Sequence, residues 1–230
     1  MKKLVIIPAY NEMASIVDTV REVEKNAAEF DYVVINDCST DKTRELCIEH
    51  KLNFIDLPVN LGIGGAVQTG YQYAYQNGYD LAVQVDGDGQ HDPTFLEKMA
   101  NVLIQEKQDM VIGTRFINKE GFQSSGIRRM GIRYFTFLIK ILTKKEVTDP
   151  TSGLRMVGKK GIEVFAKDYP KDYPEPESVV LILRKGMQVK EIPVLMRERS
   201  GGVSSISVKK SIYYMIKVTL AILLECIRKR

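Results

Sequence analysis

Short apolar runs alternate with longer amphipathic stretches through the first half of the chain, and this order restricts the fold more than any other feature of the sequence. Runs such as KLVIIPA at residues 3–9 and LAVQVD at 81–86 predict buried strands. Between these runs, the spacing of Ile16, Val20 and Val23 predicts a helix. Regular strand–helix alternation is typical of an α/β layered domain with a mostly parallel central sheet. In such a sheet, ligands bind at the carboxyl ends of the strands.

The same two patterns predict the other elements. No internal repeat or linker is visible, so we expect one domain with a C-terminal appendage. Ser39 or Thr40 is the expected cap of its helix. Loops are expected at residues 118–129 and in the proline-rich stretch 169–178. Further strands are predicted at residues 32–37, 53–58 and 109–115, within 149–157 after a turn, and at a sheet edge within 187–199. Helices are predicted at residues 13–28, 40–50, 63–78, 94–108 and 130–146.

Composition sets the broad class of protein. A chain of 230 residues can bury one large core, and 44% hydrophobic with 27% charged residues excludes both a disordered chain and an integral membrane bundle. The net charge of +4 is concentrated in the second half, which indicates an anionic partner there. Basic residues interleaved with aromatic ones are not evident, which disfavours nucleic acid. Three scattered cysteines and an N-terminus that resembles a strand rather than a signal peptide predict a cytoplasmic chain.

Two aspartates separated by one glycine follow the strand at 81–86, in the stretch QVDGDGQHDP. Neighbouring carboxylates oppose each other's ionisation unless a cation lies between them and an anion. Asp86, Asp88 and Gln90 offer the oxygen ligands that Mg²⁺ and Mn²⁺ prefer. The alternative is a solvated turn, because Asp-Gly pairs are common in turns. We expect His91 to support a ligand or to lie in the turn rather than to bind metal itself.

Seven motifs occur in an order that resembles the family 2 glycosyltransferases of the GT-A fold, and more narrowly the dolichol-phosphate mannosyltransferases and bacterial polyprenyl-phosphate glycosyltransferases. The resemblance covers nearly the whole chain to about Ser205. It implies a three-layer α/β/α GT-A catalytic domain at residues 1–205. Residues 206–230 are expected, from their own pattern, to form an amphipathic membrane-interface helix. The motifs are PAYNE at 8–12, INDCSTD at 35–41, NLGIGGAVQTG at 60–70, QVDGDGQHDP at 84–93, GTR at 113–115, DPTSGLR at 149–155 and EIPVLMRERSGGVS at 191–204.

The resemblance implies a role for each residue that matches a family motif. Asp88, Asp149 and Arg115 would be catalytic, with Asp149 orienting the reactants; a general base and a plain turn residue are the alternatives for Asp149. A surface ion pair is the alternative for each arginine. The metal, Mg²⁺ or Mn²⁺, would be held by Asp86, Asp88 and Gln90. The donor nucleotide would be bound by Pro8, Ala9, Tyr10, Glu12, Asp37, Asn60, Gly64, Asp86, Gly87 and Asp88, and the acceptor phosphate by Arg115, Arg128, Arg133, Ser152 and Arg199.

The sequence departs from the family pattern in two places. Asn36 and Cys38 replace the commoner Asp and Gly of a D-D-G-S motif, which leaves Asp37 as the acid that would accept from the nucleotide base. Ile132 stands where the mannosyltransferase relatives carry a serine near the acceptor phosphate, so that contact is either lost or supplied by Arg133. These departures favour a UDP-sugar donor over GDP-mannose.

The expected reaction is inverting, metal-dependent transfer of a monosaccharide from a nucleotide sugar to a polyprenyl phosphate. A phosphate monoester is largely dianionic at neutral pH and needs no general base, whereas a hydroxyl acceptor does. Two alternatives stay open: a family 2 transferase acting on a polysaccharide or glycolipid hydroxyl, and an inactive nucleotide-sugar-binding subunit that recruits a membrane partner. Homo-oligomerisation is also open.

The C-terminal stretch has a helical pattern with two different faces. Its longest apolar run, Val218–Leu224, is far shorter than the roughly 20 residues that span a bilayer. We therefore expect this stretch to form a helix that lies in the membrane interface with its cations toward anionic lipid. Residues 133–142 are a candidate second interfacial helix. The protein would then be peripheral or monotopic at the cytoplasmic face of the membrane. Packing on the domain or on a partner chain is the alternative. The expected cationic face carries Lys210, Lys217 and Arg228, and the apolar face Ile212, Met215, Ile216, Thr219, Ile222 and Leu223.

Overall fold

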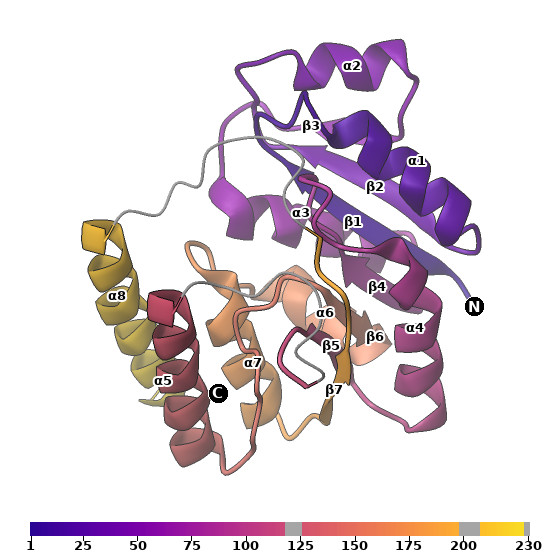
Figure 1. Cartoon of the computed structure of the whole chain (residues 1–230). Helices are drawn as coiled ribbons and strands as arrows, with labels where there is room; N and C mark the ends of the chain where they lie inside the picture. The colour runs from indigo at the N-terminus through magenta and orange to yellow at the C-terminus, as the bar shows by residue number, and fades with distance from the viewer. Residues whose placement is uncertain (118–125, 198–207, 228–230) are drawn as a thin grey trace.

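A seven-stranded sheet forms the centre of this computed structural model, which describes residues 1–117, 126–197 and 208–227 (Figure 1). The strands lie in the order β3-β2-β1-β4-β6-β5-β7. All neighbouring strands are parallel except β6, which is antiparallel to both β4 and β5. The mostly parallel sheet and the late strand at its edge are therefore confirmed. The strands are β1 (Lys3–Ala9), β2 (Asp31–Asn36), β3 (Phe54–Asp56), β4 (Leu81–Gln84), β5 (Met110–Thr114), β6 (Arg155–Gly158) and β7 (Val189–Pro193).

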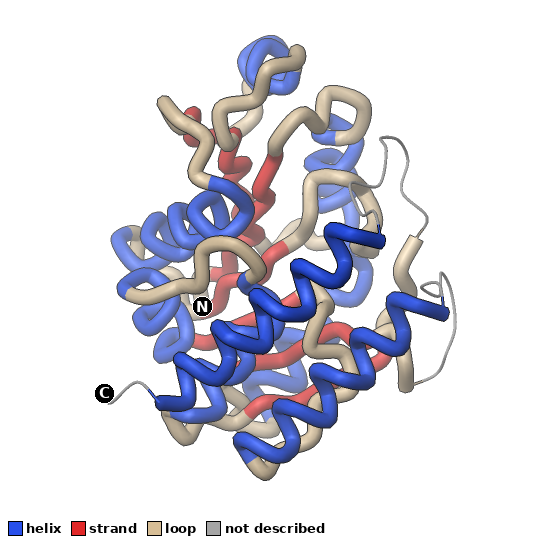
Figure 2. Tube along the Cα trace, turned by 90° about the vertical axis from the view of Figure 1, so that its left-hand side faces the viewer, coloured by secondary structure: helices blue, strands red, loops and turns tan. Residues whose placement is uncertain are grey.

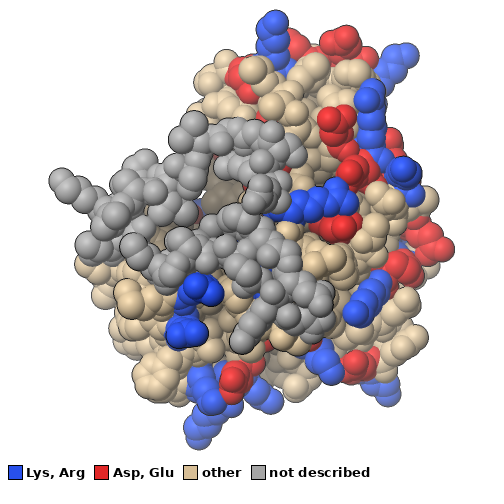
Figure 3. Space-filling view, viewed as in Figure 1, with Lys and Arg blue, Asp and Glu red and all other residues tan. Residues whose placement is uncertain are grey.

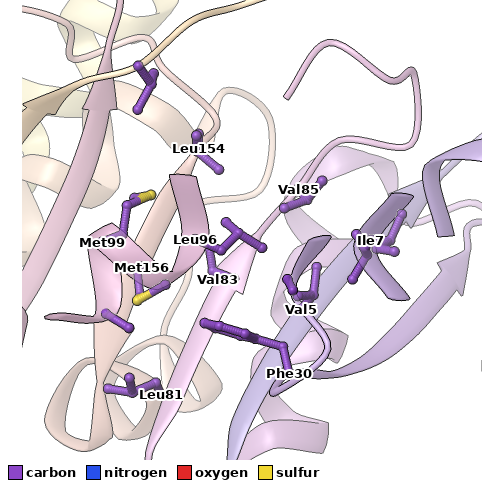
Figure 4. Close-up of a cluster of buried hydrophobic side chains, with 14 of the residues drawn as sticks. Val5, Ile7, Phe30, Leu81, Val83, Val85, Leu96, Met99, Leu154 and Met156 are labelled. Carbon is purple, nitrogen blue, oxygen red and sulfur yellow. The ribbon is translucent and has the colours of Figure 1, made fainter. Parts of the chain in front are cut away.

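Helices cover both faces of the sheet. Successive side chains of a strand point to opposite faces, so Val5 and Ile7 of β1 belong to one core and Leu4 and Ile6 to the other. The first core, part of which Figure 4 shows, packs under α1, α2 and α4, and the second packs under α3, α6 and α7. This is the expected three-layer α/β/α arrangement. The helices are α1 (Ile16–Asn26), α2 (Thr43–Glu49), α3 (Gly62–Gln76), α4 (Leu96–Gln105, after a 3₁₀ turn at Pro93–Phe95), α5 (Gly126–Thr143), α6 (Lys159–Lys167), α7 (Pro174–Arg184) and α8 (Val208–Ile227).

Three local predictions were wrong. Helix α7 begins at Pro174, inside the expected loop 169–178, because the first turn of a helix needs no bonded N–H and tolerates proline. Helix α2 begins at Thr43, where the Asp41 carboxylate accepts the Thr43 N–H at 2.9 Å, so neither Ser39 nor Thr40 caps it. Helix α5 extends back into the expected loop 118–129, and α6 was not predicted.

Helices α5 and α8 lie side by side outside α7, as Figures 1 and 2 both show. A third apolar cluster joins them through Phe135 and Ile139 of α5, Val180 of α7, and Val218 and Ile222 of α8. The expected helix at the C-terminus is therefore present, and it packs on the domain.

The predicted division of α8 into one cationic and one apolar face differs from the structure. Lys217 lies 2.7 Å from Asp172 and 5.7 Å from the centre of the Tyr213 ring, whereas Ile216 and Leu223 are exposed and Ile222 is buried. The helix has apolar residues on two sides because one side packs on the domain while another faces outward. Lys210, Ile212 and Arg228 lie outside the described side chains.

Candidate active site

Sheet topology brings the predicted motifs to one edge of the sheet. The parallel strands β2, β1 and β4 are neighbours, so the residues that follow them meet at their carboxyl ends. Strand β6 runs the other way, and its first residue, Arg155, pairs with Gln84 at the end of β4. The turn at 149–154 therefore reaches the same edge, and one antiparallel strand adds the DPTSG segment to the site.

Asp86 is held through both its side chain and its backbone. Its Oδ1 accepts a hydrogen bond from Gln84 Nε2 at 2.9 Å, and its backbone N–H donates to Nδ1 of the buried His91 at 3.0 Å. A Cβ at Gly153 would lie 2.9 Å from Asp86 Oδ2, so only glycine leaves room there. The Asp86 side chain nevertheless stays 36% exposed, and it can reach a ligand. His91 thus supports Asp86, as expected from the sequence.

Asp88 is buried on the same loop, and its Oδ1 accepts the Gln90 N–H at 3.0 Å. Gln90 is tied in turn to Arg197, whose N–H donates to the Gln90 carbonyl at 3.0 Å. The Arg197 guanidinium pairs with Glu22 and, at 3.2 Å, with Asp92. Burial disfavours ionised Asp92, but hydrogen bonds from Thr94 and the Arg197 charge outweigh it and lower the Asp92 pKa.

Asp86 and Asp88 carry the oxygen donors that a divalent cation such as Mg²⁺ prefers. Within the described ranges, three or more His, Cys, Asp or Glu side chains never come together in a cage that could hold a metal alone. Mg²⁺ commonly takes one or two carboxylates and completes its shell with water and substrate phosphates. Asp86 and Asp88 match that donor set. Gln90 donates its amide nitrogen to the Arg197 carbonyl at 3.4 Å, so its amide oxygen is the atom suited to a cation.

The residues expected to bind the donor surround the ends of β1, β2 and β4. Asp37 is only 3% exposed, and its Oδ1 accepts the Leu61 N–H at 2.7 Å. Asn60 donates to the Asp37 carbonyl at 3.0 Å, which fixes the two residues together. Tyr10 is 49% exposed at the rim. Pro8, Ala9, Glu12 and Gly87 lie at the same edge, and a Cβ at Gly87 would approach the Pro8 carbonyl to 3.0 Å.

Gly64 has a neighbour that the sequence did not indicate. A Cβ at this position would lie 2.2 Å from the backbone oxygens of Pro170 and Lys171, and the Gly64 N–H donates to Lys171 O at 3.1 Å. Glycine is therefore required for the close approach of α3 to the segment before α7. The expected contact of Gly64 with the nucleotide stays a prediction.

The structure explains the asparagine that departs from the family pattern. Asn36 donates to Asp56 Oδ1 at 2.6 Å, and Arg44 binds the other oxygen of Asp56 at 2.6 Å. Burial raises the Asp56 pKa, but the bonds from Arg44 and Asn36 outweigh it and lower the pKa overall. An aspartate at position 36 would place two carboxylates in contact, so the amide is the compatible side chain.

Cys38 lies where the family pattern has glycine, and its φ of +56° is in the left-handed region. A non-glycine residue has a steric cost there of about 1–2 kcal/mol. We expect Cys38→Gly to raise the free energy of unfolding by about 0.5–1 kcal/mol, since the loss of strain exceeds the added chain entropy. Urea denaturation measures it. Cys38→Ala is the matched control, because it removes the thiol and keeps the strain; equal stability of the two variants would contradict this account.

Arg115 and Asp149 form a buried ion pair just beyond β5. Arg115 Nε and Nη2 donate to the two Asp149 oxygens, each at 2.7 Å, and Nη2 also contacts the Thr151 hydroxyl at 3.1 Å. Asp149 is 0% exposed and Arg115 is 7% exposed. Two parallel bonds fix the plane of a guanidinium group, so this cation has a defined orientation at the edge of the site.

Two residues that the sequence analysis did not single out hold this turn. Arg155, 1% exposed, donates to the carbonyls of Pro150 and Ser152, each at 2.7 Å, and it also binds the Glu175 carbonyl and the Ser178 hydroxyl. Glu191 of β7 accepts the backbone N–H groups of Thr148 and Asp149. The sequence did carry a sign of both residues. Each is a charged residue in a predicted strand with apolar neighbours: Arg155 ends the motif DPTSGLR, and Glu191 begins the motif EIPVLMRERSGGVS.

The expected acceptor-binding residues are only partly brought together. Ser152 is buried and donates its hydroxyl to the Gly113 carbonyl at 2.6 Å. Arg133 is exposed on α5, and Ile132 beside it is buried, so Ile132 packs inward. The Arg128 side chain and Arg199 lie outside the described residues. Among the described members of this set, Arg115 and Ser152 have side chains that hydrogen bonds hold in place, and the acceptor-binding role of every member stays a prediction.

The strand order, the antiparallel β6 and the carboxylate pair after β4 together define the GT-A class of nucleotide-sugar transferase fold. Solved structures agree with this class. Glucosyl-3-phosphoglycerate synthase from Mycobacterium tuberculosis, in complex with Mn²⁺, UDP and phosphoglyceric acid, superposes with a TM-score of 0.76 at 17% identity, over 98% of this chain and 78% of that one. Staphylococcus aureus TarS with UDP-GlcNAc gives 0.64 at 18% identity, over 97% and 67%. These likenesses establish the fold.

Sequence comparison identifies the family. Residues 4–165 match the model of glycosyl transferase family 2, and the chain belongs to this family. An uncharacterised protein of Methanocaldococcus jannaschii is 31% identical over 83% of this chain and 79% of its own. The UDP-N-acetylglucosamine–dolichyl-phosphate N-acetylglucosaminyltransferase of Methanococcus voltae is 30% identical over 82% and 83%, and the undecaprenyl-phosphate mannosyltransferase of Micrococcus luteus is 27% identical over 90% and 88%.

Proposed function

We propose that this glycosyltransferase moves a monosaccharide from a nucleoside diphosphate to a polyprenyl phosphate, with inversion at the anomeric carbon. The observation that carries the proposal is the state of Asp149: it is wholly buried, and both of its oxygens already accept bonds from Arg115. A carboxylate held in this way is poorly placed to take a proton from a hydroxyl acceptor. A lipid phosphate is already anionic and needs an oriented cation instead.

The carboxylate side of the site suits the donor. Asp86 and Asp88 would hold Mg²⁺ or Mn²⁺, which as a Lewis acid would stabilise the departing diphosphate. Asp37, just beyond the end of β2, would accept a hydrogen bond from the base. We favour a UDP-sugar because the Methanococcus voltae relative is named for a UDP donor. GDP-mannose is the second candidate, since the Micrococcus luteus relative is a mannosyltransferase.

One assay separates this function from its alternatives. Purified protein is incubated with undecaprenyl phosphate and labelled UDP- and GDP-sugars, with Mg²⁺ or Mn²⁺ and with EDTA. We expect labelled lipid that is lost on chelation. Product formed only on hydroxyl acceptors would support the polysaccharide or glycolipid alternative, and nucleotide-sugar binding without turnover would support the inactive subunit.

The outer surface of α5 and α8 supports a membrane-bound acceptor. Each helix carries a stripe of exposed apolar side chains at helical spacing. Because the two helices are neighbours (Figure 2), we treat these side chains together as one surface, named here the α5–α8 face. Figure 3 shows charged side chains concentrated on the α1 and α4 side of the molecule; basic side chains also lie beside this face, where Arg129, Arg133 and Lys140 of α5 are exposed. None of the described helices is both long and apolar enough to cross a bilayer. We propose that the face lies on the membrane interface. Its residues are Met130, Tyr134, Phe137, Ile141, Tyr213, Ile216, Leu220, Leu223, Leu224 and Ile227.

Charged substitutions on this face should weaken membrane binding. Leu220 and Leu224 are 55% and 66% exposed, so replacing both with glutamate removes apolar contact with lipid without opening the core. We expect the partition coefficient onto phosphatidylglycerol vesicles, measured by sedimentation, to fall at least tenfold. Burying one apolar side chain completely contributes about 1.5–3 kcal/mol, and the double variant loses this contribution wherever the leucine was inserted into lipid. Ile48→Glu on α2, at a side chain 51% exposed, is the matched control and should bind as before. Equal binding by the double variant would contradict the membrane assignment.

A further inference from the structure

The Glu191 carboxylate is bonded to the backbone that carries Asp149. Its Oε1 accepts the Asp149 N–H at 2.8 Å, and its Oε2 accepts the Thr148 N–H at 2.7 Å. Glu191 belongs to the edge strand β7, where it is in register with Ile112 of β5. The two bonds therefore join the edge of the sheet to a turn that lies 42 residues earlier in the chain.

The segment that Glu191 holds has no regular secondary structure. Residues 147–149 belong to neither a helix nor a strand, and Pro150 follows with no N–H of its own. Local backbone geometry here depends on bonds from side chains. Glu191 binds the two N–H groups, and Arg155 binds the carbonyl of Pro150. The position of the Asp149 side chain, and with it the plane of the Arg115 guanidinium, follows from these anchors.

Only an ionised carboxylate presents one acceptor oxygen to each of two adjacent N–H groups. A glutamine would present its oxygen to one of the two backbone N–H groups and its NH₂ group to the other. Two donors would then face each other, and they repel. Burial and the nearby Asp149 charge raise the pKa of Glu191, whereas the two N–H bonds favour its ionised form. The fold thus keeps the carboxylates of Glu191 and Asp149 close together. The two backbone N–H groups and the Arg115 guanidinium offset the repulsion between these negative charges.

We propose that Glu191 is a positioning residue for the transfer reaction: through Thr148 and Asp149 it sets the orientation in which Arg115 receives an anionic phosphate acceptor. The acceptor part of this inference rests on the proposed function. Misplacement of a binding group by about 1 Å is enough to lower a rate by about a hundredfold. Glu191 bonds to the backbone of Thr148 and Asp149, and the Asp149 side chain binds Arg115, so we expect the loss of Glu191 to act on the acceptor side of the site much more than on the carboxylate loop 86–90.

The test compares Glu191→Gln with Glu106→Gln, whose carboxylate is exposed and pairs with Lys190, the neighbour of Glu191. We expect Glu191→Gln to lower kcat/KM for the acceptor by 10- to 100-fold, while the KM of the donor and the Kd of UDP change less than twofold. A merely structural defect would weaken both sides alike, and that result would overturn the proposal. Glu106→Gln should resemble the unmodified protein.

A second readout does not depend on any acceptor. In protein labelled with ¹⁵N-arginine, the Arg115 Nε–H signal is identified by its loss in Arg115→Lys. We expect its hydrogen exchange to be at least tenfold faster in Glu191→Gln and unchanged in Glu106→Gln. Unchanged exchange in Glu191→Gln overturns the proposal. If Glu191→Gln does not fold, Glu191→Asp, which keeps the charge but shortens the reach, carries the same comparison.

The two readouts also separate this inference from the proposed function. If the unmodified protein transfers no sugar to polyprenyl phosphate, the proposed function fails. The exchange of the Arg115 signal still decides whether Glu191 positions that side chain.

Discussion

Asp88→Asn should lower sugar transfer at least a thousandfold while the fold stays intact. The substitution removes one negative charge from the carboxylate pair. It keeps a side-chain oxygen that can still accept the Gln90 N–H, which lies 3.0 Å from Asp88 Oδ1 in the unmodified protein. The loop therefore keeps its shape and loses affinity for a divalent cation. Electrostatic stabilisation of developing charge commonly contributes more to catalysis than any other effect, and one group is worth about 10²–10³ in rate even when it is a neutral donor.

Initial rates at saturating donor, over a wide range of Mg²⁺ and Mn²⁺ concentrations, measure this effect. Asp18→Asn is the control, because the Asp18 side chain is 81% exposed on α1 and its carboxylate lies 3.9 Å from Arg21 of the same helix; the substitution removes one acidic charge outside the carboxylate pair and should leave the rate unchanged. Urea denaturation should show that Asp88→Asn unfolds near the midpoint of the unmodified protein. A rate within tenfold of the unmodified protein would show that the carboxylate pair does not hold the metal.

Arg155→Met should destabilise the protein by about 3–5 kcal/mol, a large part of the about 5–15 kcal/mol that stabilises a typical domain. Methionine fills similar space but donates no hydrogen bond. The carbonyls of Pro150, Ser152 and Glu175 would then be left without the partner that Arg155 gives each of them. Each buried group left unsatisfied costs about 1–3 kcal/mol. The loss also frees the turn that carries Asp149, so transfer should fall together with stability.

Urea denaturation followed by circular dichroism measures the change in unfolding free energy. Arg44→Met is the matched control: Arg44 pairs with Asp56, but its side chain is 51% exposed, and exposed pairs contribute at most about 1 kcal/mol. Arg155→Lys keeps the charge but cannot reach all of the carbonyls, so its stability should lie between those of the unmodified protein and Arg155→Met. A loss below about 1 kcal/mol in Arg155→Met, the net worth of a single ordinary hydrogen bond, would refute the role of Arg155 as the anchor of the turn.

Much of the fold could be predicted because a buried strand leaves a local pattern in the chain. Strand β1 is apolar at four consecutive positions, Leu4 to Ile7, since both faces of a central parallel strand are covered. Helix α1 shows its packed side in Ile16, Val20 and Val23, all fully buried. The sequence did not reveal two helices: α6 was not predicted, and α7 begins inside a stretch that was predicted to be a loop. Prolines in the first turn of α7 have the same sequence appearance as a loop, although they are compatible with a helix start.

The amino-acid order alone was enough for the α/β class, the family, and the placement of Asp86 and Asp88 beyond a strand end, because each of these depends on residues close together in the chain or on ordered motifs. The folded chain was needed to show that β6 is antiparallel, that Arg115 is bound to Asp149, and that Glu191 and Arg155 hold the turn between them. The bonds of Glu191 join residues that are up to 43 positions apart, and the pairing of β6 with β4 joins residues that are farther apart still. Local periodicity records which face of an element is buried but not which distant side chain lies against it, so pairings of this kind exist only after the strands have taken their order in the sheet.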